Sequence, residues 1–315
     1  MESLIYSLNA TLPVFFVIVI GYILKQIGML NDNFVEVANK FNFKVTLPIL
    51  LFTDIASTNI IKNFDGKYIL FCAVVTSICF WIIWLFSKKI MKDPSMIGAF
   101  VQASFRGSAA ILGIAFIKNI YGDSGMAPLM IIGAVPLYNI YSVIVLTFEG
   151  DNNKNGKENI KKAFINIIKN PIIIGIILGM LSSLLNINLP KIVDKTIQNF
   201  AVMATPLALV TIGAGFEGKK ALAKIKPTLV ASFIKLILQG AIFLPLAAFL
   251  GFRDQKLIAL VIMLGSPTTV SCYVMAKNMN NDDVLTSSII VVTTLLSAFT
   301  LTILIFTLKS LGLVI

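Results

Sequence analysis

The segment Val261-Ile-Met-Leu-Gly-Ser-Pro-Thr-Thr-Val-Ser271 places a proline inside an apolar stretch that is long enough to cross a membrane. Pro267 lacks an amide hydrogen and its ring clashes with the preceding turn, so we expect the helix to break here. Gly265 makes opening of the backbone easier. Irregular backbone inside a bilayer survives only where protein or a water-filled cavity surrounds it. The segment therefore predicts an internal site around Pro267.

A matching apolar segment occurs in the first half of the chain and reads Ser104-Phe-Arg-Gly-Ser-Ala-Ala-Ile-Leu-Gly-Ile-Ala115. Its glycines, Gly107 and Gly113, favour a second break. Hydroxyl side chains gather at both breaks, namely Ser104, Ser108, Ser266, Thr268, Thr269 and Ser271. Two half-helix N-termini facing one cavity would offer unsatisfied amides and partial positive charge, which suit a carboxylate. The alternative is a proline kink capped by hydroxyl groups.

Several polar side chains lie within apolar stretches. Arg106 costs about 2.5–3.5 kcal/mol on membrane-insertion scales, so it should face a cavity or a partner unless it snorkels to the interface. It would attract an anionic substrate or hold the break open. Asn139 and Tyr141 would reach a ligand or join helices through hydrogen bonds. We interpret Lys235 as a snorkelling side chain.

The two halves of the chain share a pattern of prolines and glycines. In each half a proline is followed eight residues later by a glycine and 35 residues later by a second proline. The residues concerned are Pro13, Gly21 and Pro48, and then Pro171, Gly179 and Pro206. The pattern indicates a duplicated membrane unit, an architecture typical of secondary transporters.

The composition excludes a soluble protein. Hydrophobic residues make up 57% of the chain and charged residues 13%, against about 25% charged residues in soluble domains; mean hydropathy is +0.90. The net charge of +11 comes from lysines in short polar gaps, which membrane topology explains better than nucleic-acid binding. Cys72, Cys79 and Cys272 show no metal-ligand spacing, and we expect no metal or other cofactor.

Apolar windows long enough to cross about 30 Å of hydrocarbon predict ten transmembrane helices. They lie at 5–27, 35–57, 67–90, 95–119, 127–149, 163–186, 196–217, 226–251, 255–277 and 283–313. Lysine and arginine are more frequent after odd-numbered spans, which puts those gaps in the cytoplasm and both termini outside. The polar linker 150–162 joins the halves 1–149 and 163–315. Because each half has five spans, the two repeats are inverted relative to each other.

Five further segments are specific in their order and spacing. They are Thr46-Leu-Pro-Ile-Leu-Leu-Phe52, Phe105-Arg-Gly-Ser-Ala-Ala-Ile-Leu-Gly-Ile114, Asn170-Pro-Ile-Ile-Ile-Gly175, Thr205-Pro-Leu-Ala-Leu209 with Gly213, and Pro267-Thr-Thr-Val-Ser-Cys-Tyr-Val-Met-Ala-Lys277. Through them nearly the whole chain resembles the auxin efflux carrier family, which includes the plant PIN auxin transporters and many bacterial permeases.

The resemblance implies an all-α fold like that of bile-acid symporters and sodium–proton antiporters. Broken helices four and nine would cross at Gly113, Ala115, Gly265 and Pro267. They would belong to a transport domain of spans 3–5 and 8–10. Spans 1, 2, 6 and 7 would form a scaffold domain through which two copies pair as a homodimer. Members of the family resemble elevator-type carriers of organic carboxylates.

The chain departs from the family pattern in its fourth span. Ser108 stands where the family usually has asparagine, and Ala115 stands where it usually has proline. Loss of the proline leaves Gly107 and Gly113 to support the first break. Tyr141 aligns with a tyrosine that plant members place near their ligand.

We therefore expect a multi-pass transporter of the cell membrane that carries small organic anions, from malate-like dicarboxylates to auxin-like aromatic acids. The expected substrate-binding residues are Ser104, Arg106, Ser108, Gly113, Asn139, Tyr141, Ser266, Pro267, Thr268, Thr269 and Ser271. Alternatives are a sodium- or proton-coupled symporter of another organic anion, or an anion channel. Asp54, Glu149 and Asp194 are the candidates for proton coupling. An enzyme is disfavoured because the chain has no histidine and no Gly-x-Ser-x-Gly motif.

Overall fold

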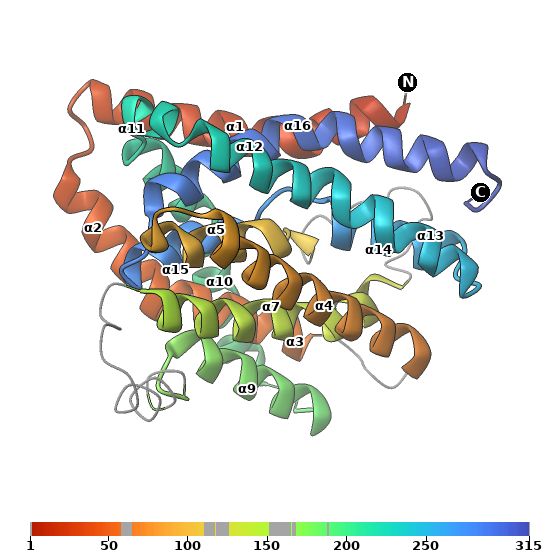
Figure 1. The fold of residues 1–315 in the computed structure, drawn as a ribbon. Helices are drawn as coiled ribbons and strands as arrows, with labels where there is room; N and C mark the ends of the chain where they lie inside the picture. The colour runs from red at the N-terminus through yellow and green to blue at the C-terminus, as the bar shows by residue number, and fades with distance from the viewer. Residues whose placement is uncertain are drawn as a thin grey trace.

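The fold is that of a helical membrane protein (Figure 1). The computed structural model describes residues 2–57, 65–109, 117, 126–150, 165, 168–187 and 189–314, with side chains from residue 12 onward. Within these ranges five helices are long and apolar enough to cross a membrane, and α1 and α9 contribute shorter apolar segments. The chain is therefore a polytopic membrane protein, as its composition predicts.

The first half contains α1 (Glu2–Gln26), α2 (Asp32–Phe41), η1 (Asn42–Thr46), α3 (Leu47–Ala56), α4 (Gly66–Ile90), η2 (Pro94–Met96), α5 (Ile97–Phe105) and α7 (Ala127–Glu149). The second half contains α9 (Pro171–Leu184), α10 (Lys191–Ala214), α11 (Gly218–Ala223), α12 (Ile225–Phe233), η3 (Ile234–Leu238), α13 (Gln239–Phe249), α14 (Asp254–Gly265), α15 (Ser271–Asn278) and α16 (Asp283–Ser310).

Asn and Asp side chains fix the beginning of several helices. Asn31 accepts a hydrogen bond from the amide of Phe34 at the start of α2, and Asn170 accepts one from Ile172 at the start of α9. Asp282 does the same for α16. These caps satisfy amides that the first turn of a helix leaves without partners.

Glycines allow two pairs of helices to approach closely. A Cβ on Gly21 of α1 would collide with the main-chain oxygen of Val210 in α10. A Cβ on Gly179 of α9 would lie 2.9 Å from the main-chain oxygen of Phe52 in α3. Small residues at such contacts are the usual basis of helix association in membranes. The two contacts correspond to each other in the two halves of the chain, since the sequence separation between Gly21 and Gly179 equals that between Phe52 and Val210.

Two of the long helices contain a short π-helical segment. η1 joins α2 to α3 without interruption, and η3 joins α12 to α13 in the same way. Such segments are uncommon and occur often at functional sites. Here η1 presents the buried Asn42, and η3 presents the buried Lys235.

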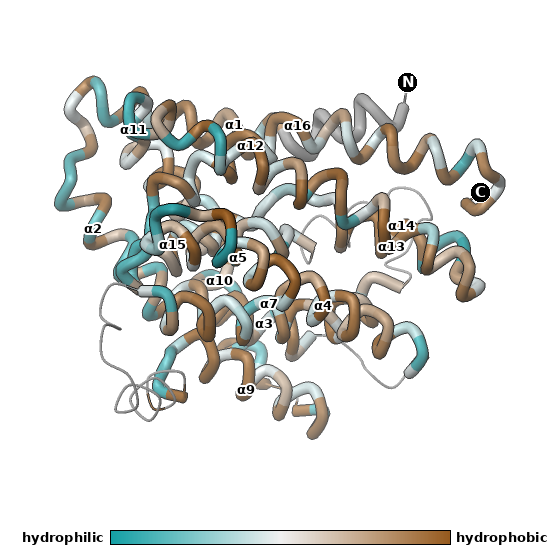
Figure 2. Tube along the Cα trace, viewed as in Figure 1, coloured by the Kyte–Doolittle hydropathy of each residue, from teal (hydrophilic) through white to brown (hydrophobic). Residues whose placement is uncertain are grey.

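Apolar side chains cover most of the helical surface, whereas polar residues gather at one end of the molecule, around α2, α11 and the end of α15 (Figure 2). The outer face of α4 shows this clearly, since Leu70, Trp81 and Leu85 are each at least half exposed. Exposed large side chains of this kind suit contact with lipid. Figure 1 also shows α1 and α16 side by side along one edge, with α9 at the opposite edge.

Candidate functional site

Two extended segments meet at the centre of the candidate site, one directly after α5 and one between α14 and α15. The chain is extended directly after α5 and directly after α14. Gly107 and Thr268 form an isolated antiparallel bridge between these extended segments. The amide of Ser108 donates a hydrogen bond to the main-chain oxygen of Pro267 at 2.9 Å. The break that Pro267 predicts is therefore present, and in the earlier segment the helix ends just before Gly107.

The C-terminal end of α5 receives its hydrogen bonds from neutral side chains. Gln239 Nε2 donates to the main-chain oxygen of Ser104 at 2.6 Å. Thr268 Oγ1 donates to that of Ala103 at 2.7 Å. These bonds satisfy carbonyl groups that have no partner within the helix.

The C-terminal end of α14 receives a cation instead. Lys235 Nζ donates to the main-chain oxygen of Leu264 at 2.8 Å and to that of Met263 at 3.2 Å. Lys235 is fully buried. The interpretation of Lys235 as a snorkelling side chain is therefore wrong, because its ammonium group is held inside the protein by the end of a broken helix.

Arg106 lies directly after α5, is 3% exposed and forms its hydrogen bonds with neutral groups. Its Nη2 donates to Asn139 Oδ1 at 3.0 Å and to Ser271 Oγ at 2.8 Å. Its Nη1 donates to Ser142 Oγ at 3.0 Å and contacts Met275 Sδ at 3.3 Å. Arg106 Nε has no acceptor, and no ion pair involves this arginine among the residues described. Within the described part of the chain, a buried positive charge is thus held by neutral groups and forms no ion pair.

Arg106 lines a small cavity of about 60 Å³ beside the crossing. α15 begins at Ser271 in the cavity wall, so that the N-terminal end of a half-helix lies at the site. The remaining walls come from η1, α3, α7 and α10. The lining residues are Asn42, Leu47, Leu50, Leu51, Asp54, Arg106, Gly107, Ser108, Ala109, Val135, Tyr138, Asn139, Ala204, Thr205, Ala208, Thr269, Val270, Ser271 and Val274.

The structure brings together about half of the residues expected at the site. Those that line the cavity are Arg106, Ser108, Asn139, Thr269 and Ser271. Others belong to the crossing itself, namely Ser104, Gly265, Ser266, Pro267 and Thr268. Gly113 and Ala115 lie outside the described residues.

Tyr141 is placed elsewhere. Its ring stacks on Phe80 with a centroid distance of 4.4 Å, and its hydroxyl lies 2.9 Å from Ser77 Oγ. It therefore packs between α7 and α4, and Tyr138 reaches the cavity in its place.

The sequence analysis missed Lys235 and Gln239 as parts of the crossing. Both are buried, and they are four positions apart in an otherwise apolar helix. That spacing puts two polar side chains on one helical face, and it is the signal that could have identified them. Asn42 was also missed; its Nδ2 donates to the main-chain oxygen of Ala204 at 2.9 Å across the cavity wall.

Of the three acidic residues considered for proton coupling, Asp54 lines the cavity. Glu149 instead accepts a hydrogen bond from Trp84 at 2.7 Å and pairs with Lys88 at 2.8 Å, at the end of α7. Asp194 is exposed in the first turn of α10.

A second, larger cavity of about 950 Å³ opens at the polar end of the molecule. Its walls carry charges of both signs, including the ion pairs Lys25–Asp32, Lys224–Asp282 and Lys277–Asp283. Helices α10 and α15 each contribute residues to both cavities: Ala208 and Val274 line the small one, and Ala214 and Lys277 line the large one. Helix α2 contributes Val35 to the large cavity, and η1, which continues it, contributes Asn42 to the small one.

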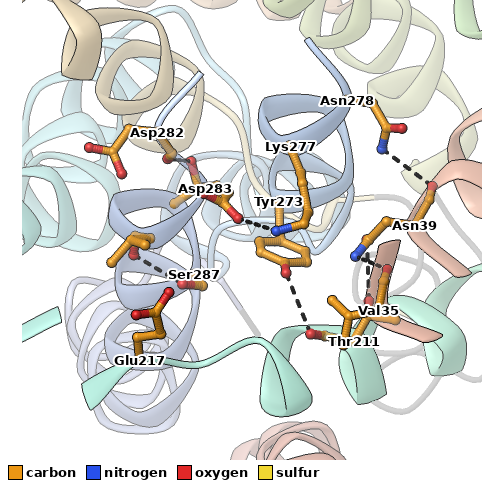
Figure 3. Close-up of polar contacts among 12 residues, drawn as sticks. Val35, Asn39, Thr211, Glu217, Tyr273, Lys277, Asn278, Asp282, Asp283 and Ser287 are labelled. Carbon is orange, nitrogen blue, oxygen red and sulfur yellow. Dashed lines mark hydrogen bonds and ion pairs between the residues drawn. The ribbon is translucent and has the colours of Figure 1, made fainter. Parts of the chain in front are cut away.

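Hydrogen bonds from polar side chains connect α2, α10 and α15, and we call this group of residues the polar seam (Figure 3). Thr211 of α10 donates to Asn39 Oδ1 of α2 at 3.3 Å. The hydroxyl of Tyr273 in α15 lies 3.5 Å from the main-chain oxygen of Thr211, and Asn278 Nδ2 donates to that of Asn39 at 3.3 Å. Asn39 lies between Val35 of the large cavity and Asn42 of the small one, and Thr211 lies between Ala214 of the large cavity and Ala208 of the small one. The seam, defined as Asn39, Thr211, Tyr273 and Asn278, therefore separates the two cavities.

Comparisons with known proteins identify the family of this chain. Residues 6–305 match the family model described as Membrane transport protein. An uncharacterized transporter of Methanocaldococcus jannaschii is 20% identical over 298 residues, covering 92% of this chain and 95% of the relative. An uncharacterized transporter of Methanothermobacter thermautotrophicus is 21% identical over 299 residues, covering 94% and 96%. The family match confirms the resemblance to the auxin efflux carrier family that the sequence motifs indicated. The chain belongs to the Membrane transport protein family.

Proposed function

We propose that the protein is a secondary carrier of small organic carboxylate anions and that it binds them beside the crossing of its two broken helices. The observation that carries the proposal is the buried guanidinium of Arg106 in the wall of the cavity, with neutral partners only in the part of the chain described. Burial of a charge is costly unless an opposite charge or strong hydrogen bonds offset it. A substrate carboxylate would supply the missing negative charge.

The groups around Arg106 suit a carboxylate. Arginine presents a planar set of donors that matches two carboxylate oxygens. Its Nε hydrogen lacks an acceptor among the residues that the structure describes, and hydroxyl groups of Ser271 and Thr269 lie in the same wall. The first turn of α15 adds the partial positive charge of a helix N-terminus. These features together favour an anion over a cation or a neutral sugar.

The substrate must displace part of the wall. A volume of about 60 Å³ is well below the roughly 300–1,000 Å³ of ordinary ligand pockets. Leu50, Leu51 and Val270 supply apolar surface beside Arg106. Aromatic acids of the auxin type and dicarboxylates of the malate type both remain within the proposal, and they differ in how much of this apolar surface they would use.

The proposed transport mechanism is of the elevator type. Spans 1, 2, 6 and 7 would form the scaffold domain, and spans 3–5 and 8–10 would form the transport domain that carries the crossing. The close contacts of α1 with α10 and of α3 with α9 support an inverted repeat, because each joins the first span of one half to the second span of the other. Dimerisation through the scaffold is part of the same proposal.

The polar seam would act as a gate between the substrate cavity and the large cavity. By the distribution of lysine and arginine, the large cavity faces the cytoplasm. Release toward the cytoplasm would require α15 to separate from α2 and α10 at Tyr273, Thr211 and Asn39. The few hydrogen bonds of the seam are individually weak, with a net contribution of about 0.5–1.5 kcal/mol each. Such a contact can open and close during transport.

Stabilisation of the purified protein by a panel of carboxylates, from malate to indole-3-acetate, tests this function. We expect a selective rise in melting temperature in wild type that is lost in Arg106→Gln. Arg253→Gln is the matched control, since Arg253 is exposed at the start of α14 and caps main-chain oxygens outside the cavity. A panel without any shift, or a shift that persists in Arg106→Gln, would contradict the proposal.

A further inference from the structure

Lys235 binds the two main-chain oxygens at the end of a broken helix. Its Nζ donates to Leu264 and Met263, which close the last turn of α14 before the chain becomes extended. Main-chain oxygens at the C-terminal end of a half-helix carry partial negative charge. In membrane carriers such ends, together with unwound backbone, are places that bind a coupling cation. The ammonium group of Lys235 therefore lies where the backbone is arranged to hold a small monovalent cation.

A second observation points to the same place. Ser266 Oγ is fully buried and has no hydrogen-bond partner within the described residues. A Cβ on Gly107 would collide with Ser266 Oγ and would lie 2.8 Å from Lys235 Cε and 3.1 Å from its Nζ. The hydroxyl and the ammonium group thus both lie close to Gly107, on the side where its Cβ would be. Carbonyl and hydroxyl oxygens are the ligands that hard cations prefer.

One helical stretch, η3 with the start of α13, donates hydrogen bonds to the C-terminal ends of both α5 and α14, but with different chemical groups. Lys235 lies in the π-helical segment η3, Gln239 directly follows that segment, and both side chains are buried. Gln239 gives α5 a neutral amide donor, whereas Lys235 gives α14 a full positive charge. No acidic side chain pairs with Lys235 in the described part of the chain. Its charge is therefore compensated by the oxygens of the broken helix.

We propose that Lys235 is a built-in cation that takes the place of a coupling sodium ion at the helix crossing, so that the carrier works without sodium. The inference rests on the proposed carrier function and adds that transport is not coupled to sodium. A free cation would compete with a tethered ammonium whose local concentration is fixed by its own helix. Transport then depends on the anion gradient, the membrane potential or protons.

Chemical replacement of the ammonium group tests the inference. Lys235→Ala removes the side chain beyond Cβ and leaves space for propylammonium, which reproduces the three missing carbons and the charge. Lys235→Met fills most of this space without a charge. Lys44→Ala is the matched control, because Lys44 also lies in a π-helical segment, η1, but is exposed. Melting temperatures are measured in sodium, choline and propylammonium chloride at equal ionic strength.

We expect wild type and Lys44→Ala to melt at the same temperature in sodium as in choline. Lys235→Ala should melt several degrees lower in choline and should recover a substantial part of that loss in propylammonium or sodium. Lys235→Met should melt lower and recover in neither. A rise of the wild-type melting temperature in sodium would overturn the proposal, as would a Lys235→Ala protein that melts like wild type.

The test does not depend on the substrate. If Lys235→Ala yields no folded protein, the wild-type comparison still decides, since a specific sodium effect contradicts the proposal and its absence supports it. Failure of the carboxylate panel would contradict the proposed function alone, because the cation measurements contain no carboxylate. Conversely, a sodium effect in wild type would overturn the role of Lys235 and leave the anion site intact.

Discussion

Gly107 and Thr268 pair between the extended segments that follow α5 and α14, although about half of the chain separates them in sequence. Next to Gly107, Arg106 donates hydrogen bonds to neutral partners, and Lys235 holds the end of α14 just before Thr268. The two extended segments are short, and each is tied to the other by main-chain hydrogen bonding.

Gly107→Ala should damage the crossing. A Cβ at this position would meet Ser266 Oγ and the end of Lys235, which have no free space to move into because both are fully buried. Overpacking of this kind usually costs about 1–3 kcal/mol. Thermal unfolding of the purified variant measures the loss. Gly240→Ala serves as control, since its Cβ would make ordinary contact with Leu304 at 3.4 Å; equal effects of the two substitutions would contradict the packing described.

Gly21→Ala and Gly179→Ala should each loosen one of the close helix pairs. Their new methyl groups would press on the main chain of Val210 and Phe52, which cannot move as a side chain can. We expect both variants to melt lower than Gly218→Ala, where the added Cβ would find Phe216 at 3.9 Å. A lower melting temperature in one variant and not in the other would argue against equivalent roles for the two contacts.

Tyr273→Phe should open the seam more often. Loss of its weak hydrogen bond to Thr211 removes about 0.5–1.5 kcal/mol at most, which corresponds to about a 2- to 10-fold change in the open population. The rate at which a thiol reagent modifies a cysteine introduced at Thr269, in the small cavity, measures the change. Tyr141→Phe is the matched control because Tyr141 contacts neither cavity. An unchanged rate in Tyr273→Phe would contradict the gate.

The ion pair between Asp65 and Lys256 should make the protein sensitive to acid. The hydrogen bond from Lys256, at 2.6 Å, holds the pKa of the Asp65 carboxyl below its usual range. Because the pKa of this carboxyl is lower in the folded than in the unfolded protein, its ionised form stabilises the fold at pH values above the ordinary pKa of about 3.9. This stabilisation is lost as the pH falls through the lowered pKa. Because the pair is partly exposed, its effect should stay below about 1 kcal/mol. Asp65→Asn should therefore melt slightly lower than wild type at pH 7, and the difference should begin to shrink below about pH 4 and vanish once the pH is below the lowered pKa.

The helical class and the broken helix at Pro267 followed from the sequence, because hydropathy and proline chemistry act locally. Placement of the first break was less secure. Without the family proline at Ala115, several glycines could support it, and tertiary pairing of Gly107 with Thr268 selected the position. Lys235 was misinterpreted for a related reason. Whether a lysine in an apolar helix reaches the interface depends on its neighbours, and here α14 provides the oxygens that hold it.

The most direct test of the central claim is calorimetric titration of the purified protein with the carboxylate that stabilises it best. The account predicts binding that weakens by about 10-fold or more in Arg106→Gln, because a hydrogen bond to a charged group contributes about 1.5–3 kcal/mol. It predicts unchanged binding in Arg253→Gln. Equal affinities of wild type and Arg106→Gln would show that the buried guanidinium does not bind the substrate, and the anion site would have to lie elsewhere.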